Sequence, residues 1–69
     1  MTFEQIEKIF THHPPKGTQT HRYEQIRARA KEFGLLIVAH VPDSRERALA
    51  LTSLQQTVMW ANAAIAINE

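Results

Sequence analysis

The C-terminal third of this sequence, Ala48–Asn68, contains no charged residue, yet its composition is that of one continuous helix. A helix on a solvated surface normally turns a charged face to water. One that is uncharged most of the way round is covered by a large core or by lipid. A chain of 69 residues has too little material for a large core of its own. Either lipid or further copies of the chain must therefore cover this helix.

Lipid is the weaker explanation. The segment has about the length of a membrane span, which needs roughly 20 apolar residues. Polar side chains interrupt it, however, and a pair of amides near the middle of a span is costly in hydrocarbon. These polar residues are Thr52, Ser53, Gln55, Gln56, Thr57 and Asn62. The sequence also starts without the basic and apolar pattern of a signal peptide. We therefore expect a homo-oligomer in the cytoplasm, without a membrane partner.

Composition narrows the classes of protein further. The net charge is only +1, whereas a protein that coats duplex nucleic acid shows a strongly basic face. Cysteine is absent, which removes disulfides, thiolate nucleophiles and cysteine-based zinc sites and fits a reducing compartment. A single domain this small usually needs disulfides, a metal or partner subunits for stability. Since disulfides are absent, we expect partner subunits or a metal to stabilise this chain.

The N-terminal segment is predicted to be a short helix over residues 1–10. Thr2 and Gln5 form a capping-box pattern at its start. Apolar residues then recur at helical spacing: Phe3, Ile6, Ile9 and Phe10. A loop over residues 11–20 follows, because consecutive prolines at 14 and 15 prevent a regular helix and Gly17 adds a flexible position.

The remainder predicts a long antiparallel helical hairpin, so that the fold class is all-α. Its helices should cover residues 21–41 and 44–67, with Thr18 or Thr20 capping the first and Asp43 or Ser44 the second. The short link at Pro42 makes the two helices antiparallel neighbours. Their facing seams are predicted to be Tyr23, Ile26, Ala30, Phe33 and Ile37 on one side and Leu51, Leu54, Val58, Ala61 and Ile65 on the other.

A second apolar stripe on the last helix has nothing in the chain to cover it except the short first helix. It consists of Leu49, Met59, Trp60, Ala63 and Ile67. Alanines along the same helix would let helices of different copies approach closely. This stripe is the main argument from sequence for a homo-oligomer.

The stretch from His12 to Arg27 is the richest in groups that could bind a ligand. A loop that contains Gly17 and leads into a helix start favours anions, because free backbone N–H groups and the helix dipole meet there. Lys16 can add a point charge, and Arg22 and Arg27 can bind phosphate through paired hydrogen bonds. Tyr23, or an imidazole of the loop, can stack on a base. These groups suit a small, anionic, ring-bearing ligand such as a nucleotide.

Each of these residues also has a structural interpretation. Tyr23 lies on the apolar seam and is about as well explained as a core residue with its hydroxyl at the edge. Arg27 is also explained as an ordinary surface arginine. Thr18 and Thr20 are better explained as helix caps than as ligand contacts. We expect no metal site, since the four histidines lack the i,i+4 pairing of helical metal sites. We also expect no enzyme, because the sequence contains no nucleophile motif and no positioned acid–base pair.

Several motifs together resemble one bacteriophage family. The residues that carry the resemblance are His13-Pro14-Pro15-Lys16-Gly17, Gln19, Arg22-Tyr23-Glu24, Ile26-Arg27, Pro42-Asp43-Ser44-Arg45-Glu46, Leu51, Leu54 and Val58-Met59-Trp60-Ala61-Asn62-Ala63-Ala64-Ile65-Ala66. Over nearly all of residues 10–69 the chain resembles the helical-hairpin domain of the anti-CBASS and anti-Thoeris sponge proteins. The resemblance implies a homohexamer that captures cyclic nucleotide immune signals between its subunits and does not degrade them. The captured signals would be cyclic dinucleotides, cyclic trinucleotides or cyclic ADP-ribose isomers.

The resemblance also implies which residues line the pocket. We expect ligand contacts from His13, Lys16, Gly17, Gln19, Arg22, Tyr23, Arg27 and Asn62. His13 or Tyr23 would stack on a base, Arg27 and Lys16 would neutralise phosphate, and Gln19 would read a base edge or ribose. A buried amide between subunits explains Asn62 equally well. Ile67 stands near the C-terminus where the family pattern has a basic residue, which leaves a second, trinucleotide site in doubt.

Two alternatives come from other classes of protein. The short turn at Pro42 could belong to a DNA-binding helix-turn-helix, but the helix after it carries no basic residue beyond Arg47. A purely structural phage oligomer without a ligand is the other alternative.

Overall fold

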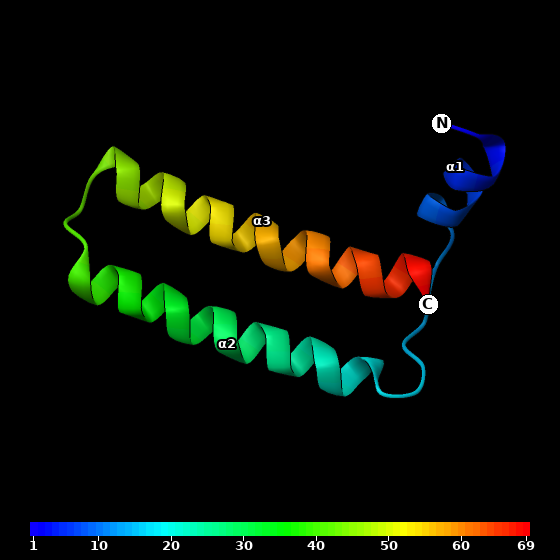
Figure 1. The fold of residues 1–69 in the computed structure, drawn as a ribbon, viewed down its shortest axis with the longest axis horizontal. Coiled ribbons are helices and arrows are strands. Elements are labelled where there is room, and N and C mark those ends of the chain that lie inside the picture. The colour runs from blue at the N-terminus through cyan, green and yellow to red at the C-terminus, as the bar shows by residue number, and fades with distance from the viewer.

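The fold consists of three helices and no strand, and the computed structural model describes all residues, 1–69. The helices are α1 (Phe3–Phe10), α2 (Gln19–His40) and α3 (Arg45–Asn68). α2 and α3 lie side by side and antiparallel, and α1 lies at the open end of this hairpin, near the last turn of α3 (Figure 1). The predicted all-α fold with a helical hairpin is confirmed.

α1 begins with the predicted capping box. The backbone N–H of Gln5 donates to Thr2 Oγ1 at 3.1 Å, and the backbone N–H of Thr2 donates to Gln5 Oε1 at 2.7 Å. One side-chain hydrogen bond joins α1 to the hairpin, from Lys8 Nζ to Asn68 Oδ1 at 3.3 Å. The first helix therefore forms for a local reason and lies beside the end of α3.

α2 begins at Gln19, two residues earlier than the sequence predicted, so the loop spans 11–18 and not 11–20. Gly17 has a φ of +57°, in the left-handed region that favours glycine, and reverses the chain within one residue. The backbone N–H of Gln19 then donates to the carbonyl of Lys16 at 3.1 Å. Thr18 occupies the cap position, but its side chain makes no capping hydrogen bond. The predicted threonine cap at this position is therefore wrong.

The turn between the long helices resolves the choice between two caps. Ser44 is the cap of α3, and its Oγ accepts a hydrogen bond from the backbone N–H of Arg47 at 3.1 Å. Asp43 instead pairs with the Arg47 guanidinium at 3.1 Å. A hydroxyl cap and an ion pair thus hold the same turn.

The seam between α2 and α3 differs from the predicted one at a single position. Phe33 was expected to lie on this seam but is 56% exposed, and the half-buried Gly34 lies there in its place. A β-carbon added at Gly34 would lie 3.6 Å from Leu54 Cδ2, which is ordinary contact and shows that this position faces α3. Successive residues of a helix are turned by about 100°, which carries the ring of Phe33 away from α3.

No hydrophobic side chain of the lone chain is buried, and the only buried residue is Gln19. The accessible surface is 5746 Å², whereas a compact protein of 7.9 kDa exposes about 4400 Å². The radius of gyration is 15.3 Å, compared with about 11 Å for a compact domain of this length. The chain is a flat, open hairpin of 45 × 28 × 12 Å. None of its helices combines the length and the apolarity that crossing a bilayer requires.

Candidate functional site

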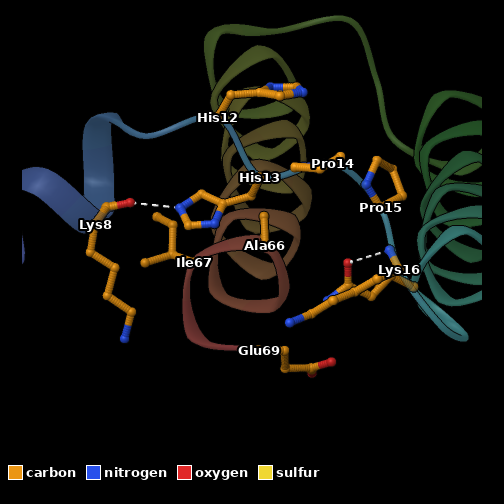
Figure 2. Close-up of a pocket in the computed structure, with 10 residues that line it drawn as sticks. Lys8, His12, His13, Pro14, Pro15, Lys16, Ala66, Ile67 and Glu69 are labelled. Carbon is orange, nitrogen blue, oxygen red and sulfur yellow. Dashed lines mark hydrogen bonds between the residues drawn. The ribbon is translucent and has the colours of Figure 1, made fainter.

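Two adjoining hollows lie at the open end of the hairpin. The larger, of about 420 Å³, is formed by the end of α1, the loop and the last turn of α3 (Figure 2). Its lining residues are Lys8, His12, His13, Pro14, Pro15, Lys16, Gln19, Ala66, Ile67 and Glu69. The smaller, of about 320 Å³, lies on the hairpin and is lined by Tyr23, Arg27, Asn62, Ala63 and Ala66. Because Ala66 lines both, the two hollows meet over α3.

The loop that walls the larger hollow is held from both ends. At its start His13 Nε2 donates to the carbonyl oxygen of Lys8 at 2.7 Å, so this ring is fixed against the end of α1 (Figure 2). At its end the left-handed Gly17 turns the chain into α2. Between them Pro14 and Pro15 restrict the backbone, because each ring fixes φ. The loop thus presents its histidines and Lys16 on a constrained backbone.

Gln19 joins the loop to α3 and is 3% exposed. Its Oε1 accepts a hydrogen bond from the backbone N–H of Lys16 at 3.1 Å. Its Nε2 donates to the carbonyl oxygen of Ile65 at 3.5 Å, a long bond. Both polar atoms of this amide therefore have partners within the chain, and the side chain fixes the floor of the larger hollow.

Arg22 and Glu69 form an ion pair across the open end, between the first turn of α2 and the residue after α3. Arg22 Nη1 donates to Glu69 Oε2 at 2.8 Å, and Nη2 donates to Oε1, so the pair is bidentate. Hydrogen bonding to Arg22 lowers the pKa of the Glu69 carboxyl, and the same bond raises the pKa of Arg22 above its usual value. The nearby Gln19 amide and the charge of Lys16 also lower the pKa of Glu69.

The two hollows are lined by several cationic and planar side chains. Lys8 and Lys16 line the larger one together with two imidazoles, and Glu69 is its only acidic residue. The guanidinium of Arg27 and the phenol of Tyr23 line the smaller one. Asn62 adds an amide whose Oδ1 is buried and lacks a hydrogen-bond partner. Such surroundings favour a ligand that carries negative charge and flat rings.

The structure divides the eight predicted site residues between these places. His13, Lys16 and Gln19 line the larger hollow. Tyr23, Arg27 and Asn62 line the smaller one. Gly17 shapes the turn and Arg22 is paired with Glu69, and neither of these two lines a hollow.

Sequence reasoning missed Lys8 and Glu69 as parts of the site. Lys8 comes from α1, whose position beside α3 has no local sequence signal. Glu69 could have been found, because it is the first charged residue after the uncharged stretch and α3 returns it to the start of α2. The pairing of Tyr23 with Asn62 could also have been found, since both lie the same number of residues from the turn at Pro42–Asp43.

No group of three or more His, Cys, Asp or Glu side chains is arranged to hold a metal ion. The residues that line the two hollows are chemically suited to a small anionic, ring-bearing ligand.

The chain belongs to the family described as Acb2/Tad1, hairpin domain, which matches residues 3–66. This is the family of anti-CBASS and anti-Thoeris sponges, and its general role is to sequester cyclic nucleotides rather than to act as an enzyme. The predicted family is therefore confirmed. Neither a curated protein nor a solved structure matches the chain.

Proposed function

We propose that this protein binds cyclic nucleotide immune messengers, holds them uncleaved, and thereby blocks CBASS or Thoeris signalling in the cytoplasm of a bacterial host. The proposed ligands are cyclic dinucleotides in the first place, with cyclic trinucleotides or cyclic ADP-ribose isomers as further candidates. The proposed binding unit is a homohexamer. Capture lowers the free concentration of the messenger by mass action and saturates when the sites are full.

The observation that carries this proposal is the smaller hollow. It brings an aromatic ring, a guanidinium and an amide together from two helices: Tyr23, Arg27 and Asn62. A ring can stack on a base, a guanidinium can bind phosphate with two parallel hydrogen bonds, and an amide can pair with a base edge. A cyclic nucleotide offers all three partners within one compact molecule.

The larger hollow supports the same ligand class. His13 and Lys16 lie on its wall, beside Lys8. Because the two hollows meet at Ala66, a ligand in the smaller one can extend a phosphate or ribose toward these cations.

The exposed apolar surface supports assembly. The chain exposes about 1300 Å² more than a compact protein of its mass, which exceeds the ~800 Å² per partner of a standard protein interface. Trp60, Met59 and Phe33 are 74%, 61% and 56% exposed in the lone chain. A second copy that covers these side chains would also add a wall to hollows that lie on the surface of one copy.

Isothermal titration against a panel of cyclic dinucleotides, cyclic trinucleotides and cyclic ADP-ribose isomers tests this function. We expect Arg27→Ala to weaken binding about 10- to 100-fold, the cost of a lost hydrogen bond to a charged group, without changing the oligomer. Arg29→Ala is the matched control, because Arg29 lies on the same helix, pairs with Glu32 at 3.2 Å and lines neither hollow. No heat with any member of the panel at micromolar protein would refute the function.

Mass spectrometry of the ligand after release by heat tests capture without cleavage. We expect the recovered mass to equal that of the intact cyclic nucleotide after prolonged incubation. A linear product, with the mass of one added water, would show that the protein is a hydrolase.

A further inference from the structure

The carboxylate of Glu69 is held as a bound anion would be. Two nitrogens of the Arg22 guanidinium contact its two oxygens, one of them at 2.8 Å. Lys16 and Gln19 line the larger hollow together with Glu69, and both lower the pKa of its carboxyl. The carboxylate is thus paired with a guanidinium and shares a hollow with an ammonium and an amide.

A guanidinium presents the same fork of donors to a carboxylate and to a phosphate. The place of the Glu69 carboxylate is therefore chemically suited to a phosphate group. Arg22 itself lines neither hollow, and its two Nη atoms reach the edge of the larger one only through Glu69, which does line it. Its Nε is buried and has no hydrogen-bond partner, so the guanidinium is not fully satisfied by the pair.

Glu69 can leave this place without disturbing a helix. α3 ends at Asn68, so the side chain of Glu69 lies beyond the last helical residue. The two side chains are 40% and 42% exposed, and ion pairs in such contact with water are weak. Release of the carboxylate would leave Arg22 facing the mouth of the larger hollow beside Lys16.

We propose that Arg22, Lys16 and Gln19 form a phosphate site that Glu69 occupies in the free chain, and that a ligand phosphate displaces the Glu69 carboxylate. The identity of the ligand, a phosphodiester of a cyclic nucleotide, rests on the proposed function. The exchange itself rests on the geometry of the ion pair and applies to any small phosphate compound. Glu69 then sets the affinity of the site by competing with the ligand for one guanidinium.

Titration of the wild type and of Glu69→Gln with inorganic pyrophosphate, and in parallel with a cyclic dinucleotide, tests the exchange. We expect Glu69→Gln to bind each probe about two- to fivefold more tightly, the worth of one exposed ion pair. Glu46→Gln is the matched control, because it removes the same charge from the first turn of α3 at the other end of the hairpin and should change nothing.

The same substitution in an Arg22→Ala background separates competition for the guanidinium from the loss of repulsion between Glu69 and the phosphate. If Glu69 acts through Arg22, Glu69→Gln does not increase the affinity for either probe when Arg22 is replaced by alanine. A gain of the same size in both backgrounds would overturn the exchange. Binding by Glu69→Gln that is equal to or weaker than that of the wild type would overturn it as well.

A second measurement follows the Glu69 carboxyl directly, by carbon NMR titration of the wild type with and without saturating pyrophosphate. We expect its pKa to rise on saturation, because the carboxylate loses Arg22 and gains a negative neighbour. An unchanged, lowered pKa in the complex would show that the pair persists and would contradict the exchange.

The two proposals fail separately. Binding of a cyclic dinucleotide with no gain in Glu69→Gln would remove the exchange and leave the proposed function intact. Exchange with pyrophosphate, but no binding of any cyclic nucleotide, would remove the function and leave the anion site intact.

Discussion

The two ends of the hairpin are held together in different ways. The open end, where residues 8–22 meet residues 65–69, is joined by polar contacts between residues far apart in the sequence: Lys8 with Asn68, Gln19 with Ile65 and Arg22 with Glu69. In the part of the hairpin nearer the turn, residues 33–60, side-chain hydrogen bonds and ion pairs stay within the turn or within one helix. We call this second region the distal arm.

The distal arm also exposes most of the large apolar side chains. These are Phe33, Leu35, Leu36, Val38, Val41, Leu49, Met59 and Trp60. The open end combines a fixed geometry and cations suited to a ligand with the exposed apolar side chains of α1, among them Phe3 and Phe10. The arm exposes apolar surface without such long-range polar contacts. The apolar surface of the arm is therefore the first place to test for a contact between copies.

The largest expected effect concerns assembly through the arm. Trp60 is 74% exposed in the lone chain. If a neighbouring copy covers it, Trp60→Ala should weaken association by about 2–4 kcal/mol per interface, as buried tryptophans at interfaces do. Sedimentation velocity would then show smaller species at equal concentration. Arg45→Ala, in the first turn of the same helix, is the control, and an unchanged oligomer in Trp60→Ala would exclude this face as an interface.

The next effect concerns the polar contacts of the open end. Gln19→Ala leaves the N–H of Lys16 and the carbonyl of Ile65 without their partner. We expect a loss of about 1 kcal/mol in the free energy of unfolding, the net worth of a hydrogen bond between part-buried groups. Denaturant unfolding at fixed chain concentration measures it. Gln25→Ala, an exposed glutamine of the same helix, should cost little, and equal losses in both would contradict the role of Gln19.

Gly17 contributes to the open end through its backbone conformation. Its φ of +57° is unfavourable for a residue with a side chain, although a β-carbon there would meet nothing within 4 Å. Gly17→Ala should therefore cost about 1 kcal/mol of stability through backbone strain alone. Thermal unfolding at fixed concentration tests this, and a stabilised variant would show that the turn is not left-handed.

Gly34 is the matching glycine of the distal arm, and its replacement should have the opposite sign. It lies inside α2, and an added β-carbon would meet Leu54 Cδ2 at 3.6 Å, which is ordinary contact. Gly34→Ala should stabilise by up to about 1 kcal/mol, because alanine favours the helix. A marked destabilisation, measured in the same unfolding experiment, would mean that a neighbouring copy packs closely at this point.

The smallest effect is the pH dependence of the Arg22–Glu69 pair. Because the folded chain lowers the pKa of Glu69, the pair stabilises the fold above the usual pKa of glutamate, and this contribution is lost as pH falls through the lowered value. The difference in melting temperature between wild type and Glu69→Gln should therefore be present at neutral pH and vanish in acid. A difference that is constant with pH would exclude ionisation of Glu69 as its cause.

Sequence patterns predicted the fold well wherever the signal was local. The capping box of Thr2 and Gln5 and the cap at Ser44 follow from hydrogen bonds within four residues. The start of α2 was predicted two residues too late because a threonine cap was expected there. The turn at the left-handed Gly17 leads into the helix at Gln19, and no side chain caps it. Phe33 was misplaced because an apolar residue at helical spacing was assumed to face the partner helix, whereas α2 turns Gly34 toward α3 and Phe33 away from it.

The candidate site was predictable in its chemistry and less so in its arrangement. Residue types alone indicated an anionic, ring-bearing ligand. Which side chains share a hollow depends on contacts between residues 46 to 60 positions apart, such as Gln19 with Ile65 and Lys8 with Asn68. The pair of Gln19 and Ile65 follows from the antiparallel register of α2 and α3. No sequence rule predicts where α1 packs, so the pair of Lys8 and Asn68 could not be predicted.

Native mass spectrometry of the protein mixed with a cyclic dinucleotide reports both the number of chains and the mass of the ligand in one spectrum. We expect an oligomer of the 7.9 kDa chain, a hexamer in the proposed form, that carries intact cyclic nucleotide. A folded single chain without ligand, at concentrations where the messenger is in excess, would contradict this expectation.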